Sequence, residues 1–137
     1  MKEIERLIER AKQVRANAHA PYSGFLVGVA IKALINGKEE THLGVNVENC
    51  SYGLTVCAER NAVASAVASG MKMGGLEMVV IVAESDHDTT PCGACRQVLL
   101  EFAAPEAKIV IYNEKNCSYR LFSLLDLIPE PFLARNL

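Results

Sequence analysis

The sequence predicts an α/β fold, a three-layer α/β/α sandwich built on a mixed five-stranded sheet. An amphipathic helical pattern opens the chain, and short apolar runs of strand length follow it. Two further helical segments separate some of these runs, which gives the order α-β-β-α-β-α-β-β. Helices inserted between strands in this way cover both faces of a sheet.

The composition indicates one globular domain over residues 1–137, because half of the residues are hydrophobic and can form a core of ordinary size. The net charge is −2 and no run of Lys or Arg occurs, so a nucleic-acid polymer is not an expected partner. Residues 78–83 form the longest apolar run, which is too short to span a membrane, and the charged N-terminus does not resemble a signal peptide. We therefore expect a cytoplasmic protein without a membrane partner.

The first elements are a helix and a hairpin. Residues 4–14 repeat apolar side chains at helical spacing, and the turn residues 21–24 end this segment. Residues 25–35 are rich in Val, Ile and Leu and predict a strand. Asn36-Gly37 provides the positive φ of a tight turn into a second strand over residues 41–47. These strands should be antiparallel neighbours.

The middle of the chain predicts a buried helix and a central strand. Residues 57–69 carry alanines on more than one face, which indicates a helix packed on the sheet on one side and on another element, possibly a second subunit, on the other. Gly70 is a suitable left-handed end for it. Residues 78–83 are apolar without alternation, as in a strand covered on both faces.

The last third predicts a helix, two strands and a stiff tail. The helix begins at Cys92, just after Pro91, and strands follow at residues 108–112 and 119–122. Residues 123–126 resemble a helix cap and one turn. Prolines at positions 129 and 131 then exclude regular structure and leave Phe132 on the tail.

Three cysteines have the spacing of a catalytic metal site. Cys92 and Cys95 lie three residues apart at a helix start, where both can bind one ion. Cys57 offers a third thiolate and leaves the fourth tetrahedral position open, as a catalytic zinc requires. Glu59 stands two residues from Cys57, within reach of a water at that position, where a general acid/base belongs.

The cysteines also fit two other interpretations. Cys92 and Cys95 alone fit a redox dithiol or half of a structural zinc knuckle equally well. A closed structural site needs a fourth Cys or His, and a redox pair explains neither Cys57 nor Glu59. Cys50 and Cys117 form no second close pair, and we expect them to be small buried hydrophobic residues.

Asn46 and Glu48 form a polar pair at the end of the second strand. The two-residue period of an extended chain predicts that both side chains lie on the same face. From the residues alone, a solvated strand end explains this pair at least as well as a binding site does.

Four motifs together resemble the small homotetrameric, zinc-dependent cytidine deaminases of pyrimidine nucleoside salvage. They occur in that family's order and spacing, and the likeness runs nearly end to end. The motifs are Ala20-Pro21-Tyr22-Ser23-Gly24-Phe25 with Val27-Gly28, Gly44-Val45-Asn46-Val47-Glu48-Asn49, Cys57-Ala58-Glu59-Arg60, and Pro91-Cys92-Gly93-Ala94-Cys95-Arg96-Gln97.

The resemblance implies a cytidine deaminase-like fold and hydrolytic deamination of cytidine and 2′-deoxycytidine to uridine and 2′-deoxyuridine, with release of ammonia. Cys57, Cys92 and Cys95 would bind one Zn²⁺ per chain. Glu59 would take a proton from the zinc-activated water, deliver it to the pyrimidine N3 and help ammonia leave from C4. Zinc deaminases as a class use this chemistry, with a glutamate that is not a zinc ligand as the general acid/base.

The resemblance also assigns residues around the zinc and the substrate. Arg60 and the two helix N-termini would withdraw electron density from the thiolates, and Gln97 would add a hydrogen bond near them. Further substrate contacts would come from Phe25, which packs beside the nucleoside, from Ala58, and from Asn46 and Glu48, which hold the ribose 3′-hydroxyl.

The expected assembly is a homotetramer with sites at subunit contacts, in which Phe132 stacks on a pyrimidine bound to a neighbouring subunit. A negative Glu48 and the lack of a basic cluster favour a free nucleoside over a nucleotide. The chain departs from the family at Cys50 and at Glu130-Pro131. The remaining alternatives are a blasticidin S deaminase-like enzyme, a polynucleotide-editing deaminase and a noncatalytic zinc-binding module.

Overall fold

The computed structural model describes residues 2–137, which form a mixed sheet covered by helices. The helices are α1 (Lys2–Arg15), α2 (Ala58–Ala68), α3 (Gly93–Phe102) and α4 (Leu124–Leu127), with single 3-10 turns at Tyr52–Leu54 and Ala134–Asn136. The strands are β1 (Gly28–Ile35), β2 (Lys38–Val45), β3 (Leu76–Ala83), β4 (Ala103–Asn113) and β5 (Ser118–Ser123). This order matches the predicted α-β-β-α-β-α-β-β, with α4 as the expected short final turn.

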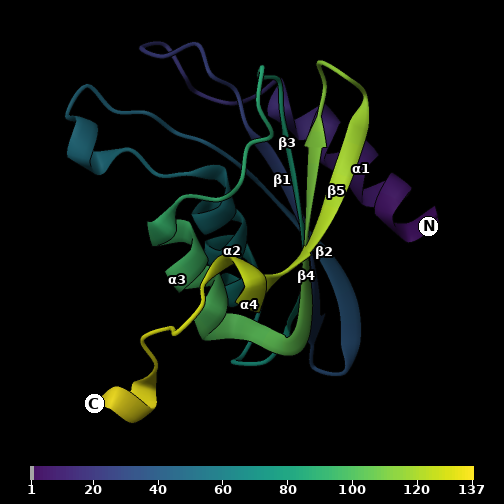
Figure 1. Cartoon of the computed structure of the whole chain (residues 1–137), viewed down its shortest axis with the longest axis vertical. Coiled ribbons are helices and arrows are strands. Elements are labelled where there is room, and N and C mark those ends of the chain that lie inside the picture. Colours follow the sequence, from purple (N-terminus) through teal and green to yellow (C-terminus); the bar gives the residue numbers. More distant parts are fainter. Residues whose placement is uncertain (1) are drawn as a thin grey trace.

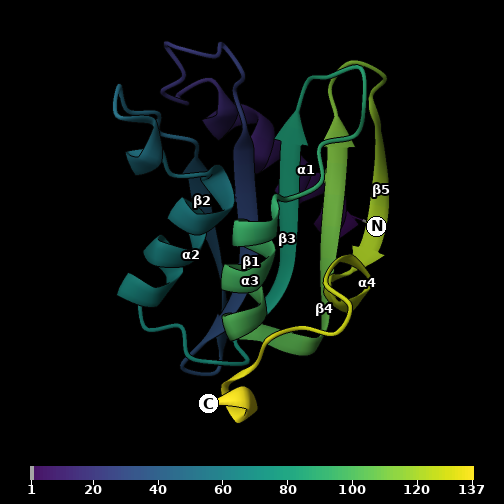
Figure 2. The same cartoon turned by 60° about the vertical axis from the view of Figure 1, so that its left-hand side comes forward.

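The sheet has the strand order β2-β1-β3-β4-β5 (Figure 2). β3 and β4 are parallel, whereas the other neighbouring pairs are antiparallel. Asn36 and Gly37 both have positive φ, 51° and 78°, and form the predicted turn between β1 and β2. The mixed five-stranded sheet is therefore confirmed.

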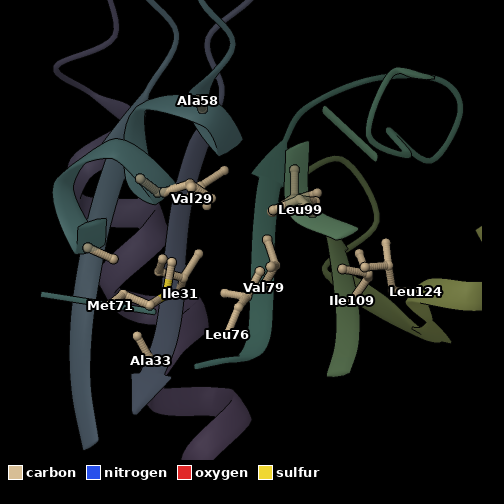
Figure 3. Close-up of a cluster of buried hydrophobic side chains, with 14 of the residues drawn as sticks. Val29, Ile31, Ala33, Ala58, Met71, Leu76, Val79, Leu99, Ile109 and Leu124 are labelled. Carbon is tan, nitrogen blue, oxygen red and sulfur yellow. The ribbon is translucent and has the colours of Figure 1, made fainter. Parts of the chain in front are cut away.

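Helices cover both faces of the sheet, with α1 on one side and α2 and α3 on the other, so the three-layer sandwich is also confirmed (Figure 1). Alternate side chains of each strand point to opposite faces. From β1, Ala30 packs with Leu7 and Ala11 of α1, while Val29 and Ile31 point to the opposite core under α2 and α3. Figure 3 shows this second core, which continues to Leu99 of α3 and Leu124 of α4.

The strand bounds differ from the predicted ones for two reasons. β2 begins at Lys38 because the tight turn pairs it with Ile35 at once, although its first residues are polar and lie on an edge of the sheet. β4 begins at Ala103, directly after α3, although Pro105 lies within it. The pairing with β3 shifts register between Leu76 and Met78, and such an irregularity tolerates proline.

One expectation about burial needs correction. Cys50 and Cys117 are exposed, because Cys50 lies in a loop and Cys117 lies in the β4–β5 turn with φ of 54°. In α2, the sheet side is buried as predicted, and Ala64, Val67 and Ala68 are exposed within the single chain. None of the helices in residues 2–137 combines the length and apolarity needed to cross a membrane.

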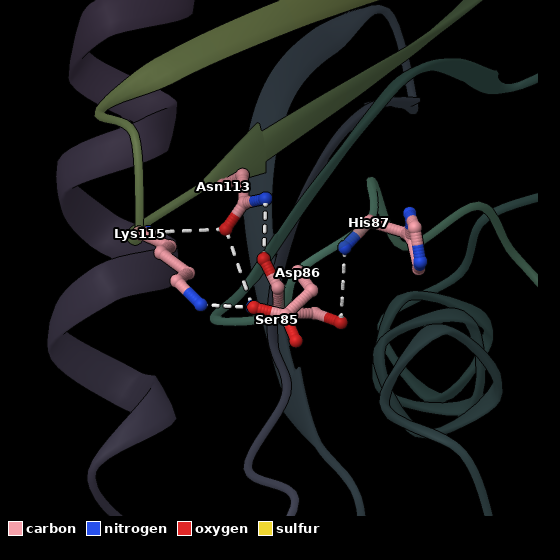
Figure 4. Close-up of polar contacts among 5 residues, drawn as sticks. All are labelled: Ser85, Asp86, His87, Asn113 and Lys115. Carbon is pink, nitrogen blue, oxygen red and sulfur yellow. Dashed lines mark hydrogen bonds and ion pairs between the residues drawn. The ribbon is translucent and has the colours of Figure 1, made fainter.

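The loop between β3 and α3, residues 84–92, carries Cys92 to its place. Its β3 end is fixed by Asn113, whose Nδ2 donates to the Ser85 carbonyl at 2.9 Å and whose Oδ1 accepts from Ser85 N at 3.3 Å (Figure 4). His87 of this loop is exposed, and Asp86 pairs with Lys115 on the surface.

Candidate active site

The N-termini of two helices bring the three cysteines together. Cys57 is the N-cap of α2 and Cys92 is the N-cap of α3, each with extended backbone, and Cys95 lies in the first turn of α3. The backbone N–H of Cys95 donates to the Cys92 Sγ at 3.5 Å. Both N-cap thiols therefore lie where the helix dipole favours negative charge.

The spacing of the sulfur atoms fits a tetrahedral zinc ion. The Sγ atoms of Cys57 and Cys92 are 4.0 Å apart, and all three Sγ atoms lie within 4.8 Å of one another. Zinc–sulfur bonds of ordinary length at tetrahedral angles place two sulfurs about 3.8 Å apart. Three thiolates are also a donor set that zinc prefers. The cluster is thus able to hold the ion.

Local charges prepare the thiol of Cys57 for metal binding. A hydrogen bond with Cys95, followed by contacts with Arg60 and Cys92, lowers the pKa of Cys57 to about 5. The Arg60 guanidinium donates to the Cys57 Sγ at 3.7 Å. The hydrogen bond with Cys57, together with burial, raises the pKa of Cys95. Metal binding requires this thiol to lose its proton.

Glu59 lies in the first turn of α2, beside the cysteines, and is only 6% exposed. Burial is the largest cause that raises the pKa of its carboxyl group, and the negative charge of Cys57 adds to it. A carboxyl group whose pKa is raised toward neutrality can both accept and donate a proton during a reaction, as a general acid/base must.

A cavity of about 200 Å³ opens beside these groups. It is lined by six of the predicted site residues, namely Phe25, Asn46, Cys57, Ala58, Glu59 and Cys92. Thr55, Thr89 and Thr90 also line it and were not singled out from the sequence. The structure therefore gathers the metal cluster, the acid/base candidate and part of the predicted substrate pocket around one space.

Asn46 and Glu48 line two neighbouring cavities. β2 ends at Val45, but Val47 forms bridges with His19 and Val56, so the chain is still extended between the two residues, as the predicted shared face requires. The Asn46 side chain bridges two backbone groups, because Oδ1 accepts from Val27 N at 2.9 Å and Nδ2 donates to the Phe25 carbonyl at 2.8 Å. Asn46 thus also holds the segment that carries Phe25.

Glu48 lines an adjacent cavity of about 390 Å³ with Tyr22, Ser23, Tyr52 and Thr55. Its carboxylate accepts from the backbone N–H groups of Tyr22 at 3.0 Å and Ser23 at 3.2 Å, and from the Ser23 hydroxyl. These bonds, above all that from Ser23, lower the pKa of Glu48. Glu48 is therefore ionised, and Thr55 joins the two cavities.

Gln97 and Phe132 lie together outside this space. The Gln97 Nε2 donates to the Phe132 carbonyl at 3.0 Å, so the side chain holds the C-terminal tail instead of making the expected hydrogen bond near the thiolates. Both residues line a separate cavity of about 240 Å³, and Phe132 is 58% exposed. Phe132 does not line the cavity that contains Glu59 of its own chain.

Sequence reasoning missed Arg96, whose side chain makes three hydrogen bonds beside the metal cluster. The sequence shows that Arg96 directly follows Cys95 in the motif, but it does not show its hydrogen-bond partners. One acceptor is the carbonyl of Leu127, 31 residues away in the chain. Such a distant backbone partner leaves no local signal in the sequence.

Comparisons with known proteins agree with this geometry. The family model described as the cytidine and deoxycytidylate deaminase zinc-binding region matches residues 1–113. Cytidine deaminase from Halalkalibacterium halodurans is 36% identical over 131 residues, which are 96% of this chain and 95% of the relative. Cytidine deaminase from Sporosarcina psychrophila is 38% identical over 114 residues, covering 82% and 79% of the two chains.

A solved structure shares the fold over nearly the whole chain. The crystal structure of cytidine deaminase from Burkholderia pseudomallei superposes with a TM-score of 0.86 at 42% identity, and the match covers 93% of this chain and 98% of that one. Since the family's zinc-binding region matches most of the sequence and the relatives align almost end to end, the chain belongs to the family of cytidine and deoxycytidylate deaminases.

Proposed function

We propose that this chain is an enzyme that hydrolyses cytidine and 2′-deoxycytidine to uridine and 2′-deoxyuridine, with release of ammonia. The single observation that carries the proposal is the buried carboxyl group of Glu59 beside three clustered thiols, in a cavity that Phe25 and Asn46 also line. The names of the relatives, which are cytidine deaminases, support the same substrate.

Cys57, Cys92 and Cys95 would hold the zinc. A zinc ion bound by three protein ligands lowers the pKa of a water molecule and so supplies hydroxide near neutral pH. Glu59 would take a proton from the attacking water and deliver it to N3 of the pyrimidine, while the water oxygen forms a bond to C4. Glu59 would then move the second proton of the water to the amino group, the C4–N bond would break and the C4 carbonyl would form, so that one water is consumed and one ammonia is released for each base. Its raised pKa suits both transfers.

The charges around the two cavities favour a free nucleoside. Glu48 is ionised at the outer cavity, and among residues 2–137 no Lys or Arg lines either cavity. A phosphate group placed there would be repelled and would find no cation. Asn46 and Glu48 would hold the sugar, with Asn46 at the inner cavity and Glu48 at the outer one.

The finer proposal is a homotetramer whose sites are completed by neighbouring chains. Ala64, Val67 and Ala68 leave an apolar strip exposed on α2, and Phe132 projects from a proline-stiffened tail outside its own cavity. A neighbouring subunit that covers this strip would explain its exposure in the single chain. Phe132 would then reach the active site of a neighbouring subunit and stack on the pyrimidine bound there. The role in nucleoside salvage and the cytoplasmic location stay predictions.

The decisive experiment measures ammonia release by zinc-loaded protein from cytidine, deoxycytidine, CMP, adenosine and blasticidin S. We expect activity on the first two alone. Activity only on blasticidin S would identify the antibiotic deaminase instead. Full zinc occupancy without ammonia release from any of these compounds would identify a noncatalytic zinc-binding module and overturn the proposal.

A further inference from the structure

Arg96 makes three hydrogen bonds from one guanidinium group. Its Nε donates to the Pro91 carbonyl at 2.7 Å, one Nη donates to the Leu127 carbonyl at 2.6 Å, and the other Nη donates to the Thr90 hydroxyl at 3.1 Å. The donors of a guanidinium form a rigid, planar fork. Three acceptors bound to it are therefore fixed relative to one another.

These acceptors come from two segments that are far apart in the sequence. Thr90 and Pro91 directly precede the thiol of Cys92, and Thr90 also lines the cavity of Glu59. Leu127 is the last residue of α4, where helix carbonyl groups lack partners within the helix. Arg96 thus connects the turn before Cys92 to the end of α4.

The loop of residues 84–92 has few other anchors near Cys92. Asn113 fixes its far end at Ser85, as Figure 4 shows. Between these ends, Asp88 pairs with Arg120 at 3.4 Å, and the Arg120 side chain is 61% exposed. An exposed pair of this kind contributes little to order. The three bonds of Arg96 are the stronger restraint on the end that presents Cys92.

The next residue of α3 holds the chain a little farther on. The Gln97 side chain donates to the Phe132 carbonyl, so consecutive residues of α3 bind the two ends of the segment between Leu127 and Phe132. Of these two residues, Arg96 alone also forms hydrogen bonds with the turn before Cys92. This difference makes Gln97 a matched control for effects that arise from the tail alone.

We propose that Arg96 is a positioning residue for the metal: by holding Thr90 and Pro91 against Leu127, it fixes the Cys92 thiol relative to Cys57 and Cys95. The inference rests on the zinc cluster of the proposed function and makes zinc retention depend on the packing of α4. Without the guanidinium, the Pro91 and Leu127 carbonyl groups lose a charged donor, and the turn gains freedom that the bound ion must restrain.

The test measures the rate at which zinc-loaded protein, without substrate, loses zinc to an excess of a chromogenic chelator. Arg96→Ala should release zinc about 10-fold faster or more, the lower end of the effect of removing groups that orient metal ligands. Arg96→Lys should also be faster than the unaltered chain, because one ammonium cannot replace the fork. Added guanidinium ion should slow the release from Arg96→Ala.

Two control variants separate positioning from a general loss of stability. Gln97→Ala frees the tail at Phe132, and Arg120→Ala removes the other arginine tied to the same loop, so both should release zinc at the unaltered rate. Release from Arg96→Ala at that rate, even with a lowered melting temperature, would overturn the inference. Equal acceleration in Arg120→Ala would overturn it as well.

A second variant keeps the inference testable if Arg96→Ala does not fold. Thr90→Val removes one acceptor with little change of shape and should speed zinc release. Combined with Arg96→Lys, it should add less than its separate effect, because both changes break one network. Full additivity would contradict the proposal. An unaltered chain that retains zinc but releases no ammonia would overturn the proposed function alone.

Discussion

A β-carbon on Gly44 would lie 2.3 Å from the carbonyl oxygen of Ala58, so β2 and the start of α2 are in direct backbone contact. The same β-carbon would lie 2.5 Å from the backbone nitrogen of Ala62. This contact fixes the first turn of α2, which presents Cys57 and Glu59 to the cavity. Glycine is required here for close approach, because any side chain would push the helix away from the sheet.

Gly44→Ala should therefore damage both stability and the site. The clash involves backbone atoms that cannot rotate aside, so we expect a loss of about 3 kcal/mol or more in the free energy of unfolding. Zinc affinity should fall with it, since Cys57 moves with the helix. Gly53→Ala is the matched control, because no heavy atom lies within 4 Å of its β-carbon. Urea unfolding and zinc analysis of both variants would measure the two effects. A Gly44→Ala variant with unaltered stability and zinc affinity would contradict the close contact between β2 and α2.

The cysteines are tested by metal content. Replacing Cys57, Cys92 or Cys95 with Ser should remove the zinc, since each provides one of the three clustered sulfur atoms. Cys50→Ala and Cys117→Ala should keep one zinc per chain, because both side chains are exposed and outside the cluster. Elemental analysis of the purified proteins decides this. Retention in a Cys57 variant together with loss in a Cys50 variant would refute the assignment.

Glu59→Gln should separate chemistry from metal binding. The amide keeps the shape of the carboxyl group but cannot transfer protons, so kcat for cytidine should fall by at least about 10²-fold. Zinc content should not change, because Glu59 is not one of the clustered ligands. Steady-state ammonia release with zinc analysis on the same sample checks both statements. Near-normal turnover would exclude Glu59 as the proton carrier.

The sequence predicted the features that depend on local pattern. The apolar runs predicted the strands and the layers, and the spacing of Cys57, Cys92 and Cys95 predicted the cluster that the structure forms. Patterns failed where the contacting groups are distant in the sequence. Asn46 and Glu48 follow the end of β2, but bridges at Val47 keep this segment extended, so the local alternation still applies to the pair.

Other features could not be predicted because the decisive contact is not local. The guanidinium of Arg96 binds a carbonyl of α4, and backbone acceptors carry no residue signature. Gln97 stands within the cysteine motif, yet its side chain binds the tail. The exposure of Cys50 and Cys117 follows from loop geometry, whereas cysteine in general favours burial.

Lys32 predicts a pH dependence of stability. Its ammonium lies 2.8 Å from Glu3, 3.0 Å from Glu39 and 3.1 Å from Glu77, which joins α1 to three strands. The hydrogen bond from Lys32 is the largest cause that lowers the pKa of Glu3. Folded Glu3 therefore binds a proton less readily than Glu3 in the unfolded chain. The Lys32–Glu3 pair contributes its full stabilisation at a pH above the pKa of unfolded Glu3. This contribution is lost as the pH falls through the lower pKa of folded Glu3.

Lys32→Met should lower the free energy of unfolding near neutral pH by about 1–2 kcal/mol, a value reduced because the carboxylates are partly exposed and screened by solvent. The difference from the unaltered chain should shrink in acid, because protonation of Glu3 removes its ion pair with Lys32 from the unaltered chain. Lys115→Met, which removes only an exposed pair with Asp86, is the control. Urea unfolding of both proteins at neutral and at acidic pH measures this difference in the free energy of unfolding. A difference that is larger in acid than at neutral pH would contradict the prediction.

Phe132 tests whether the sites are shared between chains. Its side chain is exposed, its carbonyl is held by Gln97, and it does not line the cavity of Glu59 in its own chain. If it stacks on a pyrimidine bound to a neighbour, Phe132→Ala should weaken cytidine binding by about 1–3 kcal/mol, as for other base–aromatic contacts. The melting temperature should change little, because an exposed ring contributes little to the core.

Hybrid tetramers provide the complementary measurement. Mixing inactive Glu59→Gln chains with Phe132→Ala chains should regenerate some sites that take Glu59 from one parent and Phe132 from the other. Because such a site contains both side chains, a fraction of the mixture should recover the substrate affinity of the unaltered protein. The steady-state KM of the mixture, compared with the two parents measured separately, reveals this fraction. Strict additivity of the parents, or full activity in a monomer isolated by gel filtration, would show that each chain builds its site alone.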